Sequence, residues 1–115
     1  MNLDDAIKTH SLWTHLLDRY LDRPDFSLGV QAVASADLCE LGEWLNGDGK
    51  KYANIPEFTE LVAGHRRFHQ AAADVISQAN SGQAFSRELF LGSGSAFAAA
   101  SREVLDLLLS IKNKL

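Results

Sequence analysis

The chain has 115 residues, of which 46% are apolar and 23% are charged, and its net charge is -4 at pH 7. This length predicts one globular domain over residues 1–115, with a core that needs no disulfides. The scattered lysines and arginines exclude an obvious nucleic-acid face, and the sequence lacks both a signal peptide and the roughly 18-residue apolar run of a membrane span. We therefore expect a cytoplasmic protein that binds neither nucleic acid nor membrane.

Apolar residues recur at intervals of three and four along the first half of the chain, which predicts helices. The first helix is expected over residues 3–21, before Arg23-Pro24. A second helix is expected to begin at an N-cap, Asp25, and to run to about Asn46. The segment Gly47-Asp48-Gly49 should then stop it.

The second half of the chain shows the same periodicity after a loop that reaches Asn54. Pro56 suits the first turn of a third helix, which should fade near residues 80–82. Residues 83–91 look helical, the glycine and serine alternation at 92–95 predicts a break, and Ser95 can cap a last helix. The predicted fold is an all-α antiparallel bundle of four to five helices.

The single cysteine and three of the four histidines form a candidate ligand set: His10, Cys39, His65 and His69. His65 and His69 are four residues apart on one predicted helix, so both imidazoles lie on the same face. His10 falls in the middle of the first predicted helix and Cys39 in the middle of the second. Thiolate and imidazole are the ligands that zinc prefers, and three helices could bring four of them together in a bundle core.

A structural interpretation of the same residues stays open at this point. A histidine on an apolar helix face is commonly a hydrogen-bonded core residue, and a lone buried cysteine commonly behaves as a small hydrophobic side chain. His15 lies five residues after His10 and off its face, so we interpret it as a surface residue without a role.

Three segments of the chain resemble the chemoreceptor zinc-binding domain family, abbreviated CZB. They are His10-Ser11-Leu12-Trp13, residues 38–47 with the run Cys39-Glu40-Leu41-Gly42, and His65-Arg66-Arg67-Phe68-His69. The resemblance extends over about residues 5 to 112. It implies a helical bundle that often dimerises, with zinc held by three histidines and one cysteine, which here would be His10, Cys39, His65 and His69.

Residues near these positions have a functional and a structural interpretation. Gly42 leaves room for a neighbouring helix, and Trp13 and Trp44 either shield the site from water or are simply core. Asp37 and Glu40 are candidate acceptors for imidazole N–H groups, although such carboxylates are more often solvated.

The ligand set argues against an enzyme, so we expect no catalytic residues. A hydrolytic zinc needs an open position for water, and no glutamate lies between His65 and His69 to act as a general base. The resemblance implies a regulatory module that reports zinc or an oxidant such as hypochlorous acid to a chemoreceptor or to a cyclic-di-GMP-synthesising (diguanylate cyclase) domain. No such output domain is visible in the chain, so we expect a free-standing member acting on a partner, or an excised domain.

Three functions remain open from the sequence. The first is a bacterial-type sensor in which zinc occupancy or oxidation of Cys39 changes helix packing. The second is a homodimerisation or binding module that zinc only staples together. The third is a helical adaptor without a metal, whose apolar stripes pack against a partner helix.

Overall fold

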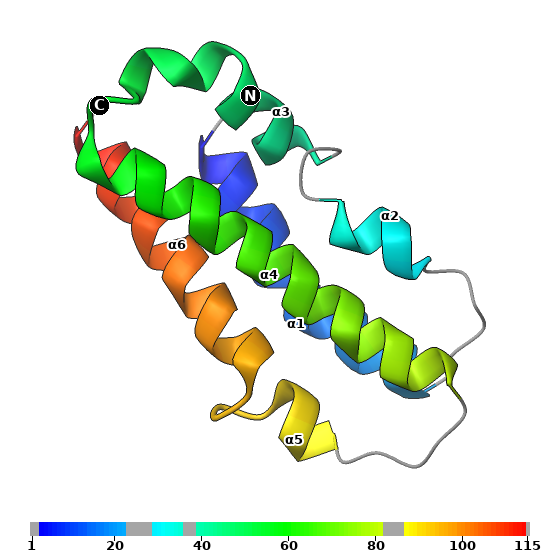
Figure 1. The fold of residues 1–115 in the computed structure, drawn as a ribbon. Coiled ribbons are helices and arrows are strands. Elements are labelled where there is room, and N and C mark those ends of the chain that lie inside the picture. The colour runs from blue at the N-terminus through cyan, green and yellow to red at the C-terminus, as the bar shows by residue number, and fades with distance from the viewer. Residues whose placement is uncertain (1–2, 23–28, 36–38, 82–86, 115) are drawn as a thin grey trace.

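The computed structural model describes residues 3–22, 29–35, 39–81 and 87–114, and these ranges are almost entirely helical (Figure 1). The elements in chain order are α1 (Leu3–Asp22), α2 (Val30–Ala34), α3 (Glu40–Asn46), the 3₁₀ helix η2 (Asp48–Tyr52), α4 (Pro56–Asn80), α5 (Arg87–Leu91) and α6 (Ala96–Lys114). The expected all-α bundle is confirmed. Among the helices described, none combines the length and the apolar character that a membrane crossing requires.

The three long helices α1, α4 and α6 lie side by side (Figure 1). Tyr20 at the end of α1 donates a hydrogen bond of 2.6 Å to Asn80 at the end of α4, so these two helices run the same way. Lys112 near the end of α6 forms an ion pair with Asp4 at the start of α1, so α6 runs antiparallel to both. The short helices α2 and α3 return the chain between α1 and α4.

The core is built on α4, whose buried residues recur at intervals of three and four over its 25 residues. Side chains of α1, α3 and α6 pack against α4 and shield this core from solvent. The largest fully buried side chains that are apolar are Phe68, Phe97, Leu17, Leu41, Leu61, Ile76, Leu108, Ile111 and Val104. Each contributes about 1.5 to 3 kcal/mol by leaving water, so the bundle has a substantial apolar core apart from any metal.

The prediction that the second helix is continuous is wrong. Among the described residues of this span, Val30–Ala34 and Glu40–Asn46 are helical and Ser35 and Cys39 are not, and the expected N-cap Asp25 lies outside the described part. Cys39 is therefore not in the middle of a helix but is the N-cap of α3, with extended φ and ψ of -85° and 158°. Its Sγ accepts a hydrogen bond of 3.4 Å from the Gly42 N–H, the role usually filled by a serine or aspartate oxygen.

Other boundaries follow the sequence closely. Pro56 begins α4, and the expected break at 92–95 separates α5 from α6. Ser95 caps α6, since its Oγ accepts a hydrogen bond of 3.1 Å from the Ala98 N–H. The expected loop before Asn54 is partly ordered instead as η2, and α5 begins at Arg87, with residues 82–86 outside the described part of the chain.

Candidate metal centre

The apolar stripe of α1 turns His10 inward, where only 3% of the residue is exposed. Its Nδ1 lies 2.8 Å from the carbonyl oxygen of Ala6, one turn earlier. Because a carbonyl can only accept, Nδ1 carries the proton and Nε2 presents its lone pair. Nε2 is buried and has no hydrogen-bond partner among the residues described.

The two histidines of α4 lie one above the other on its buried face. His65 and His69 are 2% and 3% exposed, and their Nε2 atoms are 3.0 Å apart. His69 Nδ1 donates a hydrogen bond of 2.8 Å to the carbonyl oxygen of Val33 in α2, which turns its Nε2 toward the cluster. The return segment thus helps to orient a ring on the central helix.

Cys39 approaches this pair from the start of α3. Its Sγ lies 3.2 Å from His65 Nε2, and the residue is only partly buried, unlike the three histidines. The extended backbone of the N-cap lets the side chain turn back toward α4, which a mid-helix position would not do in the same way. The break in the second predicted helix therefore directs the sulfur into the cluster.

One potential ligand atom from each of His10, Cys39, His65 and His69 lies within 4.8 Å of the other three. The nitrogen and sulfur ligands of a tetrahedral zinc lie about 3.3 to 3.7 Å apart, given bonds of about 2.0 to 2.3 Å. The cluster is thus near the size that such an ion requires. The buried, unpartnered Nε2 of His10 fits a metal ligand better than a core histidine, because leaving such an atom without a partner is costly.

Burial sets the protonation states of the cluster. It lowers the pKa of His10, of His65 to about 3 and of His69, with further lowering from neighbouring histidines at His10 and His65. Burial also raises the pKa of the Cys39 thiol, against hydrogen bonds from backbone amides that lower it. The imidazoles are therefore neutral at pH 7 and ready to bind a metal, whereas the thiol must release its proton.

The model of a protein family, the chemoreceptor zinc-binding domain, matches residues 10–76 of this chain. This match covers more than half of the sequence and contains all four residues of the cluster. The chain belongs to the CZB family. CZB domains are regulatory zinc-binding units rather than catalytic ones, so the family and the donor set both indicate zinc. No curated protein and no solved structure is significantly similar to the chain.

The aromatic neighbours of the CZB cluster differ from one another in their roles. Trp13 lies beside it, with its ring centroid 6.2 Å from that of His69. The ring centroids of Phe68 and His10 are 5.2 Å apart. Trp44 instead packs against Tyr52 of η2, with the two ring centroids 6.0 Å apart. This contact supports the packing of α3 on η2. The sequence did not single out Phe68, although its place between His65 and His69 on the same buried stripe was a usable signal.

The acceptors for the N–H groups of His10 and His69 are backbone carbonyls rather than the carboxylate of Glu40. Ala6 and Val33 supply them, whereas Glu40 is exposed and Asp37 lies outside the described residues. His15 is exposed, as expected. Gly42 is buried and acts through its N–H on Cys39.

Proposed function

We propose that His10, Cys39, His65 and His69 hold one zinc ion, and that this domain signals zinc level or oxidant to a partner or output domain. The observation that carries the proposal is the asymmetry of the cluster: three buried histidines lie on long helices, whereas Cys39 is only partly buried and lies at the start of a seven-residue helix. Cys39, the ligand that an oxidant can modify, thus lies at the start of a short helix rather than on a long one.

The thiol of Cys39 is protonated when no metal is bound, since burial raises its pKa. A bound zinc ion would hold the sulfur as a thiolate, the form that oxidants attack. The sulfur then loses two electrons to hypochlorous acid, gains the oxygen as sulfenic acid, and chloride leaves with the electron pair. A sulfenic acid is a poor metal ligand, so oxidation should weaken the hold on α3.

Detachment of Cys39 would act on α3 more than on α2. The latter stays tied to the cluster by the hydrogen bond from His69 to Val33. α3 carries Trp44, which packs on Tyr52 of η2, so a change at Cys39 would reach the surface formed by α3 and η2. In this proposal that surface reports the state of the site to a chemoreceptor or diguanylate cyclase module, with the chain acting in the cytoplasm as a homodimer.

The direct test is metal analysis of the purified chain with Cys39→Ser and a matched surface control, His15→Gln. About one zinc per native chain is expected, with weaker retention and no oxidant response in Cys39→Ser. His15→Gln should behave like the native chain, because that side chain is exposed and outside the cluster. Native-like zinc retention by Cys39→Ser would remove the sulfur from the proposed shell.

A second function is a dimerisation module that zinc only staples, and one observation favours it. The cluster joins α1, α3 and α4, so a metal there would hold these three helices together without changing the surface of the protein. Hydrogen exchange with and without a chelator separates the two functions. Loosening confined to α3 and η2 supports sensing, whereas uniform loosening of all helices supports the staple.

A further inference from the structure

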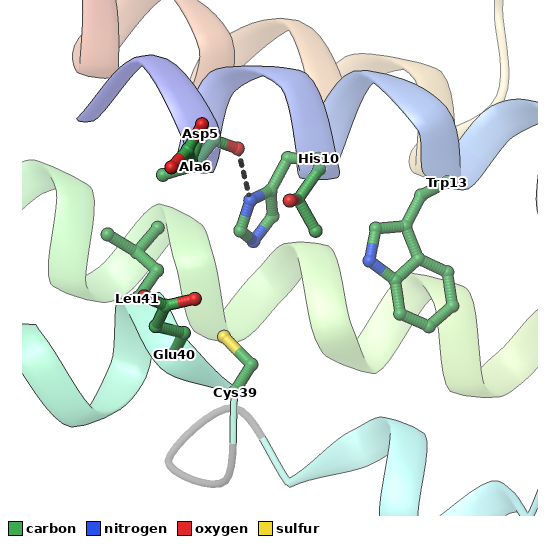
Figure 2. Close-up of a pocket in the computed structure, with 8 residues that line it drawn as sticks. Asp5, Ala6, His10, Trp13, Cys39, Glu40 and Leu41 are labelled. Atoms are coloured by element: carbon green, nitrogen blue, oxygen red, sulfur yellow. Dashed lines mark hydrogen bonds between the residues drawn. The ribbon is translucent and has the colours of Figure 1, made fainter. Parts of the chain in front are cut away.

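A small pocket opens between the start of α1 and the start of α3, next to the cluster (Figure 2). Its volume is about 50 Å³, and its lining includes Asp5, Thr9, His10, Cys39 and Glu40. Asp5, Thr9 and Glu40 are exposed, whereas only 3% of His10 is exposed. The pocket therefore leads from carboxylates at the surface to an imidazole in the interior.

His10 is the member of the cluster whose ligand atom is not engaged by another member. His65 Nε2 contacts Cys39 Sγ at 3.2 Å and His69 Nε2 at 3.0 Å. His10 Nε2 has no hydrogen-bond partner among the residues described, and its ring faces the space above Cys39 in Figure 2. A cation arriving through the pocket can bind this nitrogen without first breaking a contact.

We propose that this pocket is the entry route for the metal, and that Asp5 and Glu40 form a capture site at its mouth for a divalent cation. Carboxylate oxygens bind zinc at about 2.0 to 2.2 Å, so they can replace water before nitrogen and sulfur do. His10 and Cys39 both line the pocket, and His10 Nε2 is the ligand atom that an entering ion reaches without breaking a hydrogen bond between described residues.

The local charge also favours a cation at this place. Glu40 lines the pocket, and Glu43 lies three residues later in the same helix, α3. The negative potential of these carboxylates attracts a positive ion. Glu43 carries the same charge nearby without being among the residues that line the pocket, which makes it a matched control.

The test follows the binding of Co²⁺ to metal-free protein by stopped-flow absorption, for the native chain, the double variant Asp5→Asn with Glu40→Gln, and Glu43→Gln. We expect the association rate to fall about five-fold or more in the double variant, with a weaker dependence on salt. The dissociation rate should fall with it, because a capture site lowers the barrier in both directions. Glu43→Gln should stay within about two-fold of the native rate.

Three outcomes would overturn the inference. One is an unchanged association rate in the double variant, and another is an equal slowing in Glu43→Gln, which would indicate a general field. The third is a dissociation rate that rises as association falls, since lost attraction alone produces that. The inference rests on metal binding at the cluster and not on signalling. Failure of the native chain to bind Co²⁺ would refute the metal site itself, whereas normal binding at equal rates in all variants refutes only the entry route.

Discussion

At the scale of single residues, the state of the cluster is set by burial. His10, His65 and His69 are each almost completely removed from solvent, and burial lowers the pKa of all three. Neutral imidazoles suit a metal site, but they have a consequence for the metal-free protein. Acid must protonate histidines that the folded state keeps neutral.

The metal-free protein is therefore expected to lose stability as the pH falls below about 6.5, the ordinary histidine pKa. Between that value and the folded-state pKa of about 3 at His65, the unfolded chain binds the additional proton. Each such proton changes the free energy of unfolding by about 1.4 kcal/mol per pH unit. Urea unfolding of chelator-treated protein from pH 7.5 to 5 measures this slope.

Two variants identify the source of that slope. His65→Gln should reduce it, because the residue can no longer take up a proton on unfolding. His15→Gln, at an exposed position outside the cluster, is the control variant. An equal slope in native and His65→Gln proteins would show that other groups cause the acid sensitivity.

At the scale of elements, α3 packs on η2 through Trp44. A Cβ at Gly49 would lie 2.7 Å from the Trp44 carbonyl oxygen and 2.8 Å from its ring. Gly49→Ala should therefore displace η2 from Trp44 and destabilise the protein by about 1 to 3 kcal/mol. Thermal unfolding measures the change. Gly94→Ala is the control, because a Cβ there meets nothing within 4 Å; similar losses in both variants would contradict the packing argument.

The cap of α6 gives a second prediction for an element. The Ser95 side chain accepts from the Ala98 N–H, so Ser95→Ala should cost about 1 kcal/mol of unfolding free energy. Ser93→Ala, at an exposed position of the same turn, should cost much less. Urea unfolding at pH 7.5 compares the two, and equal effects would remove the cap from the account.

The sequence predicted the long elements well because their signals are local and redundant. α1, α4 and α6 each carry an apolar stripe over about 20 residues, and Pro56 and Ser95 mark two of their starts. The break before Cys39 was missed because the apolar pattern continues across it and a thiol is an unusual N-cap. η2 was missed because a short 3₁₀ turn has no stripe of its own.

Some features of the candidate site could also be predicted from the sequence, and others could not. The spacing of His65 and His69 placed two rings on one face, and the cysteine segment supported the rest through its resemblance to the family. The carbonyl acceptors could not be predicted equally well. Ala6 lies four residues before His10, so helix geometry could have found it, whereas Val33 is 36 residues from His69 and any residue type offers the same carbonyl.

At the scale of the whole molecule, the apolar core and the proposed zinc site involve different sets of helices. The apolar core involves α6, which contributes no member of the cluster, and the cluster joins α1, α3 and α4. Lys114 in the last turn of α6 also pairs with Glu57 in the first turn of α4, but ion pairs at the surface contribute little. The fold should therefore survive loss of the metal with reduced stability.

Removal of metal by a chelator should leave most of the helical circular dichroism while lowering the melting temperature. Zinc at about 1,000 times its Kd would restore about 4.1 kcal/mol of stability. A scan across free zinc concentrations measures the shift, and apo protein with the spectrum of an unfolded chain would contradict this expectation. His15→Gln again provides a control with an intact cluster.

Four protein atoms are proposed to surround one zinc ion, and X-ray absorption at the zinc edge measures them directly. One zinc per chain is expected, with one sulfur at about 2.3 Å and three nitrogens at about 2.0 to 2.1 Å. In Cys39→Ser the sulfur shell should disappear. A native spectrum without sulfur, or a protein that retains no zinc when purified without chelators, would contradict it.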